Sequence, residues 1–347
     1  MKVLVTGAGG LLGRYVIRKL ISYGFEVKGF DLFPPPHEFS KIDWIQGDIR
    51  DSNKVNDAVK GVDTVFHLAG RMPQWEKRLG EKNLYDINVN GTKNVIQSCI
   101  SHNVRFIVFA STTEIFGPQK KYPLSEEDTP AFTGAYSRHK FECERLLDKA
   151  CSQNKIFAIS LRLPMIFGEG FYHERSITFI FDLVRLGLPL FLFCDPKIPF
   201  TCVHAEDAAE AFILSLKTLE KMSGTNKIGK NHDVFNISSE IAPPVIDVFD
   251  SFIKRVKSKT KIIKVPLPIV KLGIILAMKL PFIPLFHTPQ ELIPFALTGA
   301  HYSIKKAKEI LGFSPKFTPE LCLEQTYNWY VKNRKISFQE RKKQGLD

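Results

Sequence analysis

The chain has 347 residues, 44% of them hydrophobic and 24% charged, so it is long enough to bury a large core without disulfides or metal. Its six cysteines form no C-x-x-C pair and no His cluster stands at zinc spacing, which argues against a disulfide scaffold and a metal site. The net charge of +12 suits nucleic acid, an anionic membrane surface or an anionic substrate, but the sequence contains no nucleic-acid-binding module.

Short apolar runs alternate with helix-like patterns through the first two thirds of the chain. The predicted strands are Val3–Thr6, Glu26–Phe30, Ile42–Gln46, Thr64–His67, Phe106–Ala110 and Phe157–Leu161. The predicted helices include Leu11–Tyr23, Asn83–His102 and Tyr136–Ser152. This alternation predicts an α/β fold, a doubly wound parallel sheet of the Rossmann type with helices on both faces.

The pattern loosens after Gly168, where prolines and aromatic-rich stretches begin. We therefore predict a core over residues 1–168 and a mixed region over 169–347. The second region is expected to form a smaller C-terminal substrate-binding cap, and the chain is expected to return to the core near 200–216 and 233–238.

The segment Val265–Phe286 is strongly apolar, but Lys271, Lys279 and four prolines interrupt it, so it is a poor candidate for a spanning helix. Three interpretations stay open: a packed helical hairpin, a lid over an apolar substrate, or a helix at a membrane surface. In the third, the lysines from residue 254 onward would meet anionic headgroups, which predicts peripheral membrane contact through 254–286. The N-terminus has no apolar stretch with a cleavage site, so we expect no secretory signal and a cytoplasmic protein.

A glycine-rich turn, Thr6-Gly7-Ala8-Gly9-Gly10-Leu11-Leu12-Gly13, follows the first predicted strand and begins the first predicted helix. Glycines there allow the backbone to approach a pyrophosphate closely, and the helix N-terminus offers free N–H groups. Asp31 ends the next strand, where a carboxylate accepts hydrogen bonds from ribose hydroxyls and repels a 2′-phosphate. The turn and Asp31 together favour NAD as the cofactor.

The sequence Tyr136-Ser137-Arg138-His139-Lys140 is the candidate reaction centre. A spacing of four places Tyr136 and Lys140 on one helix face. A nearby ammonium favours tyrosinate, so we expect Lys140 to lower the pKa of Tyr136 toward working pH.

These motifs resemble those of the extended short-chain dehydrogenases/reductases, in family order over roughly the first 210 residues. Besides the glycine turn, the matching elements are Asp48-Ile49, His67-Leu68-Ala69-Gly70, Asn88-Val89-Asn90-Gly91 and Val203-His204-Ala205-Glu206-Asp207. The resemblance implies that Tyr136 acts as acid or base, that Lys140 also holds the nicotinamide ribose, and that Thr112 orients the substrate oxygen. The implied cofactor-binding residues are Gly7, Gly10, Leu11, Leu12, Gly13, Asp31, Asp48, Ile49, Leu68, Ala69, Gly70, Asn88, Tyr136 and Lys140.

Three positions separate subclasses within this family. Thr113 stands where sugar-nucleotide dehydratases carry a catalytic Asp, and the stretch around it is equally similar to that of 3β-hydroxysteroid dehydrogenases. Met165 replaces the Asn, and Phe200 the Arg, that sugar-nucleotide enzymes usually carry, so a substrate pyrophosphate would lose charge-assisted bonds. We expect Thr112, Thr113, Met165 and Phe200 to face the substrate, and we expect that substrate to be hydrophobic.

The sequence therefore predicts an NAD-dependent oxidoreductase that interconverts a secondary alcohol and a ketone on a sterol-like or long-chain 3-hydroxy/3-keto compound. Two alternatives stay open: a sugar-nucleotide epimerase or dehydratase that keeps NAD bound, and a non-catalytic NAD-sensing scaffold. The expected partners are a small apolar substrate and, by analogy with family dimers, a second copy of the chain, but not nucleic acid.

Overall fold

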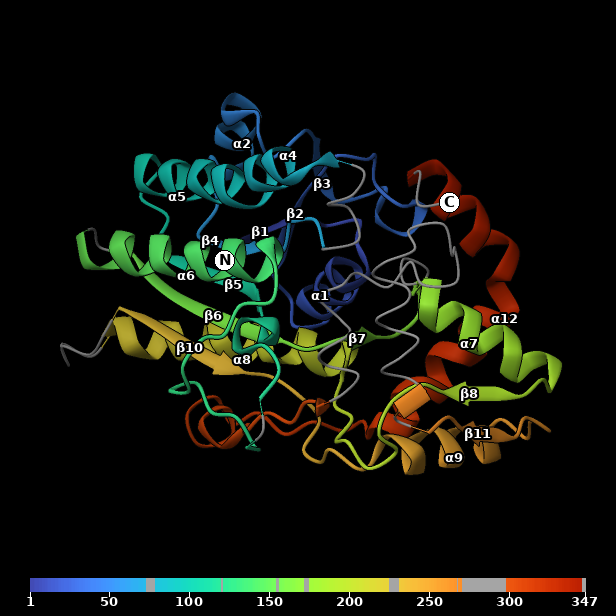
Figure 1. Ribbon diagram of the computed structural model, residues 1–347. Helices are drawn as coiled ribbons and strands as arrows, with labels where there is room; N and C mark the ends of the chain where they lie inside the picture. The colour runs from blue at the N-terminus through green and yellow to red at the C-terminus, as the bar shows by residue number, and fades with distance from the viewer. Residues whose placement is uncertain are drawn as a thin grey trace.

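Seven parallel strands form the central sheet of the computed structural model, in the order β10-β6-β5-β4-β1-β2-β3 (Figure 1). The structure describes residues 1–72, 79–119, 121–153, 156–171, 175–224, 231–266, 268–269 and 298–344. The strands of this sheet are β1 Lys2–Thr6, β2 Glu26–Asp31, β3 Asp43–Gln46, β4 Thr64–His67, β5 Phe106–Thr112, β6 Phe157–Leu163 and β10 His232–Asn236.

Helices cover both faces of this sheet, because successive side chains of a strand point to opposite faces. Val3 and Val5 of β1 pack in the layer of α1 and α8, whereas Leu4 packs in the layer of α2, α5 and α6. These helices are α1 Leu11–Ser22, α2 Ser52–Val59, α5 Gly91–Ser101, α6 Ala135–Gln153 and α8 Ala205–Gly224. The predicted doubly wound parallel sheet is confirmed.

The strand order reverses between β1 and β4, which pair in parallel, as β1 also does with β2. Connections from β1 and β4 leave toward opposite sides at this point, so a crevice forms at the carboxyl ends of the strands. The glycine turn follows β1 and the Leu68–Gly70 stretch follows β4, so both lie at that crevice.

A third hydrophobic cluster gathers elements from the C-terminal part of the chain, beside the sheet (Figure 1). Its elements are β7 Ile166–Phe167, α7 Arg175–Leu186, β8 Leu190–Leu192, α9 Val245–Arg255 and α12 Pro319–Gln344. β8 pairs in parallel with β11 Ile262–Lys264, and β7 with β9 Val203–His204. Within 169–347, α8 packs on α1, β5 and β6, and β10 pairs with β6. The division at residue 168 itself stays a prediction.

The predicted helix Asn83–His102 is interrupted in the structure. It consists of α4 Glu81–Tyr85, a π-helical turn η3 Asp86–Asn90, and α5. The Asn88 carbonyl accepts hydrogen bonds from the Thr92 hydroxyl at 2.6 Å and the Cys143 thiol at 3.2 Å. These competing donors explain why the regular helical ladder shifts at this turn, a feature often found at functional sites.

Strands β5 and β6 each extend two residues beyond the predicted ends. The added residues pair across the strands, Ser111 with Arg162 and Thr112 with Leu163. Polar residues are tolerated in this buried position because the Ser111 hydroxyl donates to the Glu144 carboxylate at 2.6 Å. Shorter elements are η1 His37–Phe39, η4 Thr113–Phe116 and η5 Ala307–Leu311.

Most of the apolar segment 265–286, residue 267 and residues 270–286, lies outside the described residues. Its three interpretations therefore stay predictions. Over the described part of the chain, no helix combines the length and hydropathy needed to cross a membrane.

Candidate active site

One cavity of about 990 Å³ runs along the carboxyl edge of the sheet. At one end it is lined by the glycine turn and Asp31, in the middle by Thr112, Tyr136 and Lys140, and at the other end by Phe200. The cavity therefore brings together the two groups of residues that the sequence assigned separately to the cofactor and to the reaction centre.

The glycine turn is packed so closely that side chains would not fit. Gly7 has φ +68°, and a Cβ there would lie 2.9 Å from the Ala69 nitrogen; a Cβ on Gly13 would lie 2.3 Å from the Gly7 oxygen. Helix α1 begins directly after Gly10, without a side-chain cap or an acidic residue in its first turn. Its free N–H groups and positive dipole end suit a pyrophosphate, and Leu11 and Leu12 line the cavity beside them.

Asp31 anchors this turn as well as facing the cavity. Its carboxylate accepts hydrogen bonds from the Gly9 amide at 2.9 Å and the Phe33 amide at 3.1 Å. Burial raises the pKa of Asp31, while the two amides oppose that rise. Each carboxylate oxygen of Asp31 keeps a second lone pair, so it can also accept a hydrogen bond from a ribose hydroxyl. The hydrogen bond from the Gly9 amide was not predicted from the sequence.

Asp48 and Ile49 line the cavity next to Asp31. The Asp48 carboxylate accepts a hydrogen bond from Arg50 Nη2 at 2.6 Å, and Arg50 lowers the pKa of that carboxyl. Ile49 is buried, and a Cβ on Gly91 would lie 2.8 Å from its Cγ2. This packing places an ionised acid and an apolar side chain at one point of the cavity wall.

The Leu68–Gly70 stretch is held by β1. The Thr6 hydroxyl accepts from the amides of Leu68 and Ala69, both at 3.2 Å. That hydroxyl also lies 2.7 Å from Nδ1 of His67, whose pKa burial lowers to about 3. Gly70 stands where the family usually has Ala; a Cβ there would lie 3.2 Å from the Asn88 side-chain oxygen and 3.4 Å from Lys140 Nζ, so its tightest contact would be with Asn88.

Asn88 has a structural position in this site. Its side-chain amide donates to the Arg71 carbonyl at 2.9 Å, and its side-chain oxygen accepts from the Arg71 amide at 2.7 Å. The two bonds fix the backbone that follows Gly70 along the cavity. Asn88 itself is buried and is not among the residues that line the cavity.

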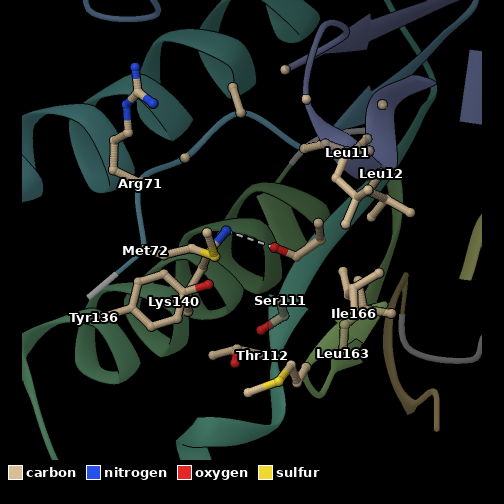
Figure 2. A pocket seen from close by; sticks show the side chains of 18 of the residues that line it. Leu11, Leu12, Arg71, Met72, Ser111, Thr112, Tyr136, Lys140, Leu163 and Ile166 are labelled. Atoms are coloured by element: carbon tan, nitrogen blue, oxygen red, sulfur yellow. Dashed lines mark hydrogen bonds between the residues drawn. The ribbon is translucent and has the colours of Figure 1, made fainter. Parts of the chain in front are cut away.

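Tyr136 and Lys140 project from α6 toward the end of β5, where Ser111 and Thr112 lie (Figure 2). Lys140 Nζ donates to the Ala110 carbonyl at 2.8 Å and lies 5.9 Å from the centroid of the Tyr136 ring. Burial lowers the pKa of Lys140 to about 8. Tyr136, Lys140 and Thr112 therefore lie together in one cavity, as the sequence predicted.

The expected lowering of the Tyr136 pKa is wrong for the protein alone. Burial raises that pKa, the Glu114 charge raises it further, and hydrogen bonding with Thr112 only partly opposes the rise. The reason is that desolvation of a fully buried phenol outweighs the hydrogen bond with Thr112, which is the one influence that favours tyrosinate. Without a further positive charge, Tyr136 is a proton donor at neutral pH.

The substrate end of the cavity is mainly apolar. Met165, Cys194, Ile198, Pro199, Phe200 and Val245 line it. Met165 is 39% exposed, and Phe200 packs on Phe249 with ring centroids 6.0 Å apart. Thr113 is buried at the cavity wall, where its hydroxyl bonds with Tyr302.

Three features of the site were not found from the sequence. Arg71 lies in the cavity wall, its side chain directed away from Tyr136 (Figure 2). Its charge opposes the rise in the pKa of Asp31 and contributes to the lowered pKa of Asp48. Tyr302 reaches the cavity from the far end of the sequence, where no motif marks it. Glu144, one helical turn beyond Lys140, forms an ion pair with Arg162 at 2.8 Å. The only sequence signal for Glu144 was its spacing of four residues from Lys140, which places both on one face of the helix.

Comparison with known proteins identifies the family. The model of the 3-beta hydroxysteroid dehydrogenase/isomerase family matches residues 4–255. Short-chain dehydrogenase/reductase family 42E member 1 of Xenopus laevis is 29% identical, over 98% of this chain and 90% of the relative. Human 3 beta-hydroxysteroid dehydrogenase type 7 is 31% identical, over 63% of this chain and 64% of the relative.

Solved structures show the same fold at lower identity. MoeE5 in complex with UDP-glucuronic acid and NAD has a TM-score of 0.73 at 21% identity, over 96% of this chain and 100% of that one. The UDP-glucose-4-epimerase of Stenotrophomonas maltophila, with bound NAD and formylated UDP-arabinopyranose, has a TM-score of 0.78 at 18% identity, over 97% and 99%. At this identity the likeness concerns the fold alone.

The fold and the glycine-lined crevice define an NAD-dependent enzyme of the extended short-chain dehydrogenase/reductase class. Within that class, the chain belongs to the 3-beta hydroxysteroid dehydrogenase/isomerase family. The predicted fold, cofactor and family are thereby confirmed. The roles of the individual site residues stay predictions.

Proposed function

We propose that this protein interconverts a secondary alcohol and a ketone on a hydrophobic substrate, sterol-like or a long-chain 3-hydroxy/3-keto compound. The observation that carries the proposal is the position of Tyr136, Thr112 and Lys140 between the glycine-lined crevice and an apolar cavity end. Bound NAD would accept or supply the hydride, because that chemistry belongs to the nicotinamide.

The protein side of the reaction is a proton transfer at the substrate oxygen. In ketone reduction, the Tyr136 phenol donates its proton to that oxygen as the carbon receives hydride; in alcohol oxidation, tyrosinate takes the proton back. Thr112 supplies a hydroxyl that orients the same oxygen. Lys140, held by the Ala110 carbonyl, contributes positive charge beside the phenol and is the candidate for binding the nicotinamide ribose.

Residues at the far end of the cavity support an apolar substrate. Phe200 and Met165 stand where a sugar-nucleotide site would need a guanidinium and an amide, and the neighbouring wall residues Cys194, Ile198 and Val245 are apolar as well. A pyrophosphate placed there would lose its hydration without charge-assisted bonds to replace it, which is costly. A sterol or acyl chain would instead bury apolar surface.

A substrate screen tests the proposal. The purified protein is given NAD with hydroxysteroids, long-chain 3-hydroxyacids and sugar nucleotides, and NADH formation is followed. We expect NADH only with the hydrophobic alcohols, and at least about a 100-fold lower kcat for Tyr136→Phe, since general acid–base catalysis is lost. NAD binding by Tyr136→Phe, measured by titration, is the control and should remain.

The outcomes separate the alternatives. Conversion of a sugar nucleotide without net NADH would establish the epimerase, which the shared fold of the solved epimerases keeps open. A scaffold that only senses NAD would bind the dinucleotide, turn over nothing in the screen, and keep its biological activity in Tyr136→Phe. Dimerisation, a cytoplasmic location and the division at residue 168 stay predictions; sedimentation, localisation and limited proteolysis would test them.

A further inference from the structure

The carboxylate of Asp48, in the wall of the cavity, is occupied by one neighbour, Arg50. Its Oδ1 accepts hydrogen bonds from the Arg50 backbone amide at 2.9 Å and from Arg50 Nε at 3.0 Å. Its Oδ2 accepts from Nε at 3.1 Å and from Nη2 at 2.6 Å. Both oxygens are therefore engaged twice, which leaves Asp48 no spare acceptor for a ligand.

The Arg50 guanidinium, in contrast, keeps donors that no protein group uses. Asp48 takes the hydrogen of Nε and one hydrogen of Nη2. Within the described part of the chain, no other residue accepts a hydrogen bond from this guanidinium, and the side chain is 46% exposed. Arg50 lines the same cavity as Asp48 and Ile49. The whole Nη1 group and the second hydrogen of Nη2 are therefore available to a ligand in the cavity.

The surrounding backbone fixes Arg50 in place. The side-chain amide of Asn94, on α5, donates to the Ile49 carbonyl at 3.0 Å and to the Arg50 carbonyl at 3.1 Å. Ile49 between them is buried and packs tightly on Gly91. A guanidinium held in this way loses little freedom for each hydrogen bond it forms with a ligand.

The base of a dinucleotide would reach this part of the cavity. Asp31, at the end of β2, has the position at which a carboxylate accepts from the adenosine ribose. Asp48, Ile49 and Arg50 line the cavity next to it. Because the purine is attached to that ribose, its edge comes within reach of the group that lies beyond Asp31.

We propose that Arg50, held by Asp48, contacts the purine edge of the dinucleotide and makes the site bind hypoxanthine at least as well as adenine. A guanidinium only donates hydrogen bonds. The amino group of adenine also only donates, whereas the oxo group that replaces it in hypoxanthine accepts. Arginine typically pairs with such an oxo group and the neighbouring ring nitrogen. Asp48 is then a positioning residue, although its resemblance to a family motif assigned it to the cofactor.

Calorimetric titration of the full-length protein with NAD and with its hypoxanthine analogue, deamino-NAD, tests the proposal. Wild type should bind deamino-NAD with a Kd equal to that of NAD or up to about tenfold lower. Arg50→Met should reverse this order, because the released Asp48 carboxylate can accept from the adenine amino group. The same variant should weaken deamino-NAD binding by about tenfold, since a charge-assisted hydrogen bond is lost.

Arg105→Met is the matched control. Arg105 is exposed and directly precedes β5, so it lies at the edge of the sheet opposite the cavity, and its replacement should leave both Kd values unchanged. Thermal unfolding without ligand shows whether the variants are folded. A wild type that prefers NAD, an Arg50→Met variant that keeps the wild-type order, or a protein that binds neither dinucleotide would overturn the proposal.

The inference goes beyond the proposed function, because it concerns the base of the cofactor and not the substrate. A protein that binds both dinucleotides but forms no NADH in the substrate screen would contradict the proposed function. The order of the two Kd values would still decide the role of Arg50.

Discussion

At the residue scale, the site is governed by what burial does to ionisable groups. Desolvation raises the pKa of Tyr136 and lowers the pKa of Lys140 to about 8, so both groups are shifted toward their neutral forms. The Glu114 charge adds to the rise at Tyr136, and Thr112 opposes it. The free enzyme therefore holds a protonated phenol at neutral pH, which suits a proton donor more than a base.

The two directions of the reaction should depend on pH in opposite ways. Alcohol oxidation needs tyrosinate, which the raised pKa of Tyr136 makes scarce until alkaline pH, so kcat/KM for oxidation should rise from neutral to alkaline pH. Ketone reduction needs the protonated phenol and should hold steady and then fall over the same range. Steady-state kinetics in both directions, with the substrate found by the screen, provides the test. An oxidation rate that falls with rising pH would contradict it.

His67 should make the fold sensitive to acid. Burial lowers its pKa from 6.5 to about 3, so below pH 6.5 the unfolded chain binds a proton that the folded chain does not. Stability present above pH 6.5 is therefore lost as the pH falls toward 3, by about 2 kcal/mol at pH 5. Urea unfolding at pH 7 and pH 5 measures this. His67→Gln should be less stable at pH 7, through lost bonds to Thr6 and Thr92, but show a smaller pH difference; surface variant His37→Gln should behave like wild type.

At the element scale, α6 is the helix that aligns the reaction centre. Tyr136, Lys140 and Glu144 follow one another at spacings of four, so they share one face. Glu144 accepts from Ser111 of β5 at 2.6 Å and from Arg162 of β6 at 2.8 Å, and both charged side chains are almost fully buried. The Glu144–Arg162 pair holds α6 to β6, and the Ser111 hydrogen bond holds α6 to β5, the strand that carries Thr112.

Removing one partner of this pair should be strongly destabilising. Glu144→Gln leaves the Arg162 guanidinium buried without a counter-charge, and we expect a loss of about 3–5 kcal/mol in the free energy of unfolding. Urea unfolding measures it, with Glu220→Gln on the exposed side of α8 as the matched control. Glu144→Gln/Arg162→Met should recover part of the loss, because it removes the unpaired charge. A loss no larger than that of the control would show that the pair contributes little.

At the scale of the whole molecule, the cavity lies where separate parts of the chain meet. The glycine turn and the strand ends supply one wall, while Cys194, Phe200 and Tyr302 come from the C-terminal part. Their positions depend on α8 and β10 packing onto the central sheet and on the third hydrophobic cluster beside it. A ligand that fills the crevice should therefore stabilise the molecule as a whole.

NAD should raise the unfolding temperature by mass action. At 100 times its Kd it should add about 2.7 kcal/mol, enough to shift the transition by several degrees. Gly13→Ala should abolish the shift, because its Cβ would lie 2.3 Å from the Gly7 oxygen. Gly9→Ala should keep it, since its Cβ would meet the Asp31 side chain at an ordinary 3.4 Å. Thermal unfolding of each variant with and without NAD measures the shift in unfolding temperature. An equal shift in Gly13→Ala and Gly9→Ala would contradict a tightly packed glycine turn.

Much of the fold and part of the site could be predicted because their signals are local. The buried strands appear as apolar runs, and Gly7, Gly13 and Asp31 stand at fixed offsets from the first two strands. Tyr136 and Lys140 share a helix face through spacing alone. The interrupted helix at Asp86–Asn90 could not be predicted, because bonds from Thr92 and Cys143 to the Asn88 carbonyl depend on how α6 packs.

The sequence by itself determined the parallel sheet, the cofactor and the family, since each rests on residues close together in the chain. Only the tertiary structure brought Tyr302 to the same cavity as Tyr136, buried the Glu144–Arg162 pair, and placed Phe191 and Phe193 on an exposed surface. It also reversed the expected direction of the Tyr136 pKa. The reason is that desolvation and long-range contacts depend on the surroundings of a side chain in space, which neighbours in the sequence do not specify.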